Sequence, residues 1–145
     1  MTPKIIYMTN IDRRYFMMRR ALDELIADGE MPASSQVVKT EDGSVWSASW
    51  EEKLRGSALV MIRFMGNTIR TKFWTACMHF LSREGIPYYM DAAGSAEEEC
   101  IERVAAKDIA AMKAYSFYGG LTNYKNLWLY ARSLFDQGMP DAEPP

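Results

Sequence analysis

The length, composition and charge of the chain exclude several classes of protein before any motif is considered. Its 145 residues are enough for one domain with a buried core, and a formal net charge of -2 with a pI near 5.5 gives no long-range attraction to phosphate backbones. Nucleic acid is therefore not expected as a partner. Membrane insertion is not expected either, because no apolar run approaches the roughly 18 residues that a spanning helix needs. The chain enters a strand-like segment almost at once, without room for a signal peptide, so we expect a cytoplasmic protein.

The first two thirds of the chain alternate between strand-like and helix-like patterns. We expect a strand at 4–9 with a helix cap at 10–12, then a helix that ends before Gly29, and then a weak strand at 36–39. A short helix through Trp46, Trp50 and Leu54 follows and closes at Gly56. The last expected elements of this part are a strand at 58–64, a helix at 69–81 that stops at Gly85, and a strand at 86–90. The strand at 58–64 is apolar nearly throughout, as expected where helices cover both faces of a parallel sheet. This alternation predicts an α/β fold, a three-layer parallel sheet of about four strands of the Rossmann or flavodoxin-like type, with right-handed crossovers.

Beyond Asp91 the pattern is helical only. We expect a helix that opens at the capping box of Ser95 and Glu98, a second that Asp108 caps and that ends at Gly119-Gly120, and a third that Thr122 or Asn123 caps and that ends at Gly138. One domain over residues 4–138 accounts for all of these elements. The remaining residues, 139–145, are rich in proline and acidic side chains and are expected to form a linker or tail.

Polar residues follow the expected strands at their carboxyl ends, where ligands of open parallel sheets bind. These residues are Thr9, Asn10 and Asp12 after the first strand, Arg63, Gly66 and Asn67 after the third, and Asp91 after the fourth. Arg63 could grip a carboxylate there, or it could pair with Asp91 or Asp12 and organise the strand ends. The turn at Gly66 and Asn67 resembles an anion-binding turn before a helix, although a flexible turn explains the glycine equally, and no nucleotide-binding loop pattern is present.

The chain offers little machinery for catalysis or metal binding. Asp12 and Asp91 could form a carboxylate pair for acid–base work, but Asp12 is also explained as a helix cap, and no Ser–His or Cys–His arrangement accompanies them. His79 has no neighbouring ligand pattern for zinc, and Cys77 and Cys100 are expected to be free thiols within helices. We therefore predict no catalytic residue, no metal site and no cofactor held by this domain.

A helix–helix corner lies at 115–127, where two glycines let one helix stop and the next begin in a new direction. Asn123 is expected to cap the new helix, and Asn126 lies one turn further on. A rigid corner accounts for this segment without any ligand. Its sequence is nevertheless the most specific in the chain.

Taken together, these motifs resemble the N-terminal region of the large tetrapyrrole-binding subunit of the cobaltochelatase (CobN) and magnesium-chelatase family. That region has a strand ending in Arg-x-x-Gly, and later a Tyr, a Gly-Gly pair, an Asn and an Asn-Leu. The matching residues here are Arg63 and Gly66, then Tyr115, Gly119, Gly120, Asn123 and Asn126-Leu127. The opening strand with Thr9 and Asp12 is also similar, whereas Asn67 replaces a second glycine that the family usually has.

The resemblance implies an accessory head domain of an ATP-dependent metal chelatase, which inserts cobalt or magnesium into a tetrapyrrole, as in cobalamin biosynthesis. ATP and the metal ion would belong to the whole enzyme. The partners would be the remainder of the large subunit, AAA+ ATPase subunits and, if this domain touches the ring, a tetrapyrrole. The chain would be one domain of a longer protein. The residues alone support an alternative, a stand-alone flavodoxin-like binding or regulatory module for an anionic small molecule beside Arg63.

Overall fold

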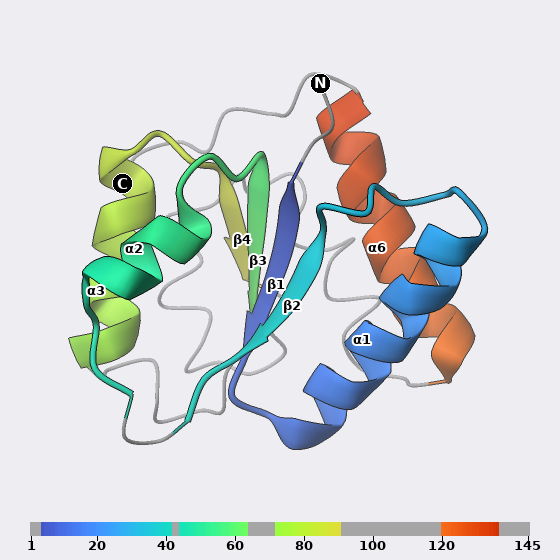
Figure 1. Ribbon diagram of the computed structural model, residues 1–145, viewed down its shortest axis with the longest axis horizontal. Coiled ribbons are helices and arrows are strands. Elements are labelled where there is room, and N and C mark those ends of the chain that lie inside the picture. Colours follow the sequence, from blue (N-terminus) through green and yellow to red (C-terminus); the bar gives the residue numbers. More distant parts are fainter. Residues whose placement is uncertain (1–3, 42–43, 64–71, 91–119, 137–145) are drawn as a thin grey trace.

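A parallel sheet lies at the centre of the protein (Figure 1). The computed structural model describes residues 4–41, 44–63, 72–90 and 120–136. The strands are β1 (Ile5–Thr9), β2 (Gln36–Lys39), β3 (Leu59–Arg63) and β4 (Tyr88–Met90), in the order β2-β1-β3-β4. All three pairings are parallel. The expected α/β class with a parallel sheet is therefore confirmed for the described part of the chain.

Helices connect the strands and lie on both sides of the sheet. They are α1 (Asp12–Ala27), α2 (Ala48–Leu54), α3 (Lys72–Arg83) and α6 (Leu121–Asp136). Figure 1 shows α1 and α6 on one side of the sheet and α2 and α3 on the other. Right-handed crossovers are expected to give this division, because the chain moves one way along the sheet from β1 to β2 and the opposite way from β3 to β4.

Glycines end three of these helices, as the sequence predicts. Gly29, Gly56 and Gly85 follow α1, α2 and α3 and have φ angles of 75°, 78° and 69°. These angles lie in the left-handed region, which glycine enters without the steric cost that a Cβ atom imposes. The glycines therefore fix where each helix gives way to the next loop.

The two central strands form the core of the protein. Every residue of β1 is 0% exposed, and so are the first four residues of β3. Apolar side chains on both faces of these strands are thus removed from water, which contributes about 1.5–3 kcal/mol for each large side chain. Their near-continuous apolar sequence is explained by this burial on both faces.

An aromatic cluster joins α2 to α3. The ring centroids of Trp46 and Trp50 lie 5.4 and 5.1 Å from that of Phe73, both with edge-to-face geometry. The indole N–H of Trp46 donates to a carboxylate oxygen of Glu51 at 3.0 Å. Trp46 therefore belongs to the predicted apolar stripe, although the helix itself begins two residues later, at Ala48.

Helix α6 docks on α1 and reaches the sheet. The indole N–H of Trp128, which is fully buried, donates to the backbone carbonyl of Met18 at 2.9 Å, and its ring lies 6.3 Å from that of Tyr7 in β1. Lys125 forms an ion pair with Glu24 of α1 at 2.7 Å. Its hydrogen bond holds the pKa of Glu24 below the ordinary value. One aromatic anchor and polar contacts around it thus fix α6 against α1.

Two predicted helix caps are wrong. The cap position of α1 is Ile11, which makes no side-chain cap hydrogen bond, and Asp12 is the first helical residue. Thr122 and Asn123, the two alternative caps of the last helix, both lie inside α6, because the helix begins at Leu121 and the amide of Tyr124 bonds to the carbonyl of Gly120 at 3.4 Å. Glycine is itself an acceptable residue before a helix, so α6 begins directly after the bend.

Candidate functional site

The strand order places a candidate site between the ends of β1 and β3. From β1 the chain crosses to β2 on one side, and β3 then lies on the other side of β1. Open parallel sheets bind ligands at such a reversal, in the crevice beyond the carboxyl ends of the two strands. Thr9 and Arg63 are the last residues of these strands, and they are register partners. The structure therefore brings together two of the residues that the sequence singles out.

Thr9 holds the end of β1 in place. It is 0% exposed, and its hydroxyl oxygen accepts the backbone N–H of Ile11 at 3.1 Å. Its backbone carbonyl accepts the N–H of Thr40 at 2.9 Å. Thr9 thus connects the turn into α1 with the end of β2, and a threonine hydroxyl can donate a hydrogen bond as well as accept one.

Thr40 adds a residue that the sequence reasoning missed. It directly follows β2 and is 2% exposed, and its hydroxyl has no hydrogen-bond partner among the described residues. Leaving a buried hydroxyl unsatisfied costs about 1–3 kcal/mol, so such a group marks a place where a ligand could be bound. The signal in the sequence was its position at the carboxyl end of a strand, the same criterion that selected Thr9.

The carboxylate of Asp12 forms an ion pair and does not cap α1. Its carboxylate lies 2.6 Å from the ammonium of Lys39, which also contacts Glu41 at 3.0 Å. The hydrogen bond that Lys39 donates to Asp12, and then the one that it donates to Glu41, raise the pKa of Lys39 above its ordinary value. Lys39 therefore stays charged, and its charge is balanced by two carboxylates beside the site.

Arg63 supplies a further positive charge at this edge. Its side chain is partly buried at the end of β3, and it already takes part in an interaction. The two interpretations of Arg63, a grip on an anion or an organiser of the strand ends, therefore both stay predictions. Either role benefits from the fixed, forked geometry of a guanidinium group.

Several predicted site and motif residues cannot be placed relative to this edge. Gly66, Asn67, Asp91, Tyr115 and Gly119 lie outside the described residues. The proposed pairing of Asp12 with Asp91 consequently stays a prediction. Gly120 lies directly before α6, and Asn126 is exposed on that helix.

Metal-binding clusters and membrane-spanning helices are absent from the described ranges. Within them, no three His, Cys, Asp or Glu side chains gather in a way that could hold a metal ion. None of the helices in the same ranges is both long and apolar enough to cross a membrane. Among the described residues, the candidate site is defined by Thr9, Thr40 and Arg63.

Comparison with known proteins assigns no family to this arrangement. No protein-family model matches the chain, and no curated protein matches it. The function must therefore be inferred from the residues of the site and from the strand order.

Proposed function

We propose that the protein is a binding module for a small anionic molecule, a carboxylate or a phosphate, held at the carboxyl edge between β1 and β3. The observation that carries this proposal is the pairing of Thr9 with Arg63 at the reversal of strand order. The hydroxyls of Thr9 and Thr40 are hydrogen-bond donors, and Arg63 supplies a guanidinium that suits planar oxyanions. Asp12 is occupied by Lys39, so the proposal assigns no acid–base step.

The proposal includes a flavodoxin-like arrangement and a cytoplasmic location. The observed order β2-β1-β3-β4 agrees with the first four strands of the flavodoxin-like order, in which the ligand lies at the β1/β3 reversal. A module that binds the anion without converting it would act as a regulator or a carrier.

Substitution of Arg63 tests this proposal. Arg63→Ala is expected to weaken binding of the anion about 10- to 100-fold, because a hydrogen bond to a charged group contributes roughly 1.5–3 kcal/mol. Calorimetric titration with inorganic phosphate, succinate and citrate provides the measurement. The affinity of Arg63→Lys should lie between those of the wild-type protein and Arg63→Ala, since lysine keeps the positive charge and lacks the forked guanidinium.

Arg20→Ala is the matched control for that experiment. Arg20 is an exposed arginine on α1 that pairs with Glu24 at 3.6 Å, so its loss changes the net charge equally without touching the strand ends. Unchanged affinity in Arg63→Ala, or an equal loss in Arg20→Ala, would contradict the proposed site.

A second proposal is the accessory head domain of a cobalt or magnesium chelatase. It is supported by the Arg-x-x-Gly and Gly-Gly-x-x-Asn motifs, and by the position of Gly120 at a bend directly before α6. In that case the domain would adjoin the remainder of the large subunit and AAA+ ATPase subunits, and ATP and the metal would act elsewhere in the enzyme. Direct contact with a tetrapyrrole should shift and broaden the Soret band of a metal-free porphyrin on titration with the protein. An unchanged band would remove ring binding from this proposal.

A further inference from the structure

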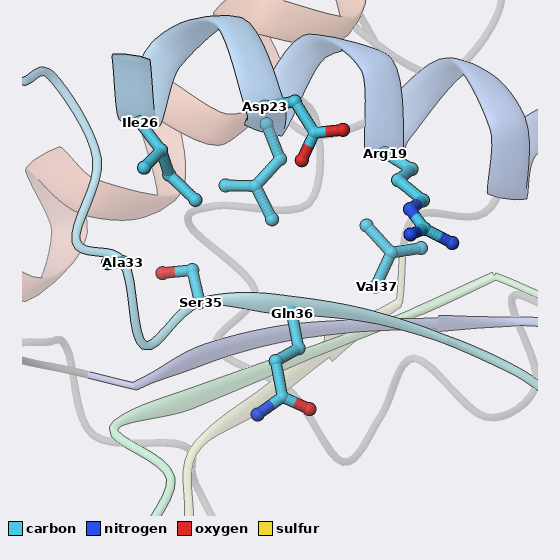
Figure 2. Close-up of a pocket in the computed structure, with 8 residues that line it drawn as sticks. Arg19, Asp23, Ile26, Ala33, Ser35, Gln36 and Val37 are labelled. Carbon is cyan, nitrogen blue, oxygen red and sulfur yellow. The ribbon is translucent and has the colours of Figure 1, made fainter. Parts of the chain in front are cut away.

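A groove lies between α1 and β2, beside the first residues of β2 rather than at the carboxyl edge. It encloses a cavity of about 380 Å³, at the lower end of the range for small-molecule pockets. Its lining residues are Arg19, Leu22, Asp23, Ile26, Ala33, Ser35, Gln36 and Val37. Figure 2 shows α1 above the groove and β2 below it, with Gln36 pointing away from the helix.

A buried hydroxyl without a partner lies at one end of this groove. Ser35 is 5% exposed, and its Oγ makes no hydrogen bond within the described part of the chain. Its backbone N–H is used, since it donates to the carbonyl of Pro32 at 3.0 Å. In Figure 2 the Ser35 hydroxyl lies on the side of β2 that faces α1. The cavity therefore contains a polar atom that a ligand could satisfy.

Two residues of α1 with opposite charges, Arg19 and Asp23, line the groove and do not form an ion pair with each other. Arg19 and Asp23 are spaced i,i+4, which usually allows an ion pair on one face of a helix. Arg19 instead donates to the hydroxyl of Tyr15 at 2.9 Å and lies 6.0 Å from the centre of that ring. Among the described residues, Asp23 has no hydrogen bond or ion pair. The groove thus presents one cation and one anion about a helical turn apart.

Apolar side chains line the rest of the groove. Leu22 is 3% exposed, and Ile26 and Val37 pack against the core while lining the cavity. A ligand that fits must therefore carry both charges and an aliphatic body between or beside them.

We infer that this groove binds a small zwitterion of amino-acid size with an aliphatic side chain. Its ammonium group bonds to Asp23 and to the Ser35 hydroxyl, its carboxylate pairs with Arg19, and its side chain packs on Leu22, Ile26 and Val37. None of these residues belongs to the edge formed by Thr9, Thr40 and Arg63, so this site stands or fails independently of the proposed anion site.

Three probes that share the aliphatic chain of leucine separate the contributions of the ammonium and the carboxylate to binding. L-leucine carries both, isopentylamine carries the ammonium only, and 4-methylpentanoate carries the carboxylate only. Backbone amide resonances of α1 and β2 are expected to shift saturably with L-leucine at about millimolar concentration, and each single-charge analogue should bind at least about 10-fold more weakly. Absence of saturable shifts with L-leucine, or equal binding of either analogue, would overturn the inference.

Variants of the lining residues then locate the site. Asp23→Asn and Arg19→Gln should each weaken L-leucine about 10-fold or more, with Asp28→Asn and Arg20→Gln as charge-matched controls outside the cavity. Ser35→Ala should weaken it roughly 3- to 10-fold while leaving the thermal midpoint of the free protein unchanged or higher, because the hydroxyl lost is unsatisfied. Losses as large in the controls as in the lining variants, or full affinity in all three lining variants, would contradict the assignment.

Discussion

Replacement of Trp128 with alanine is expected to lower the free energy of unfolding by about 3–5 kcal/mol, which is the usual cost of truncating a buried aromatic side chain. Trp128 of α6 is fully buried and contacts Met18 of α1 and Tyr7 of β1. Its removal leaves a cavity where three elements meet and deletes the hydrogen bond to the Met18 carbonyl. Urea unfolding followed by far-UV circular dichroism gives the value, and the thermal midpoint should fall by about 10 °C or more.

Two further variants separate the causes of that loss. Trp128→Phe keeps most of the apolar contact and loses the indole N–H, so its cost should lie well below that of Trp128→Ala. Phe16→Ala also truncates an aromatic residue, but Phe16 is 65% exposed, and its cost should stay within about 0.5 kcal/mol. A Trp128→Ala protein as stable as Phe16→Ala would mean that α6 does not pack on α1 and β1.

The sheet was predictable because strands that are buried on both faces are apolar at nearly every position. The segments that become β1 and β3 are apolar at nearly every position, and glycines at 29, 56 and 85 end the helices between the strands. Turn glycines and runs of apolar residues can be recognised from short stretches of the sequence. They therefore locate elements well even when the boundaries move by a residue or two.

The helix starts were predicted less well because capping depends on geometry that the sequence does not contain. Asp12 has the right chemistry to cap α1, yet Lys39 reaches it from β2, and the carboxylate pairs with that ammonium instead. Asn123 likewise suits a cap, but Gly120 already provides the bend and α6 begins at Leu121. In both cases a competing partner or an earlier turn decided the outcome.

The candidate site was predictable only in part, for a related reason. Thr9 and Arg63 follow strand-like runs, so their place at the carboxyl edge could be inferred, but their pairing depends on the strand order. Thr40 and Ser35 are ordinary residues beside a weak strand. Their importance arises from burial without a hydrogen-bond partner, a property of the folded protein alone.

A buried thiol makes the stability of the protein sensitive to alkaline pH. Cys77 is a free cysteine in α3 whose Sγ lies 4.0 Å from the sulfur of Met8, and burial raises its pKa from 9.0 to about 12. The unfolded thiol loses its proton as the pH rises through 9, whereas the native thiol keeps it until about 12. The unfolded state then binds fewer protons, so stability is fully present below pH 9 and falls by about 1.4 kcal/mol per pH unit above it.

The difference between the wild-type residue and Cys77→Ala isolates this effect, because all other titrating groups are common to both proteins. Measured in a Cys100→Ser background with a reductant, the advantage of cysteine over alanine in the free energy of unfolding should be constant between about pH 6 and pH 8. It should shrink by about 2 kcal/mol by about pH 10.5, as linkage requires for a thiol that stays protonated in the native state. A difference that stayed constant to that pH would mean that the native thiol ionises as freely as the unfolded one. Cys77 would then not be enclosed between α3 and β1, and the packing of α3 on the sheet would have to differ from that described.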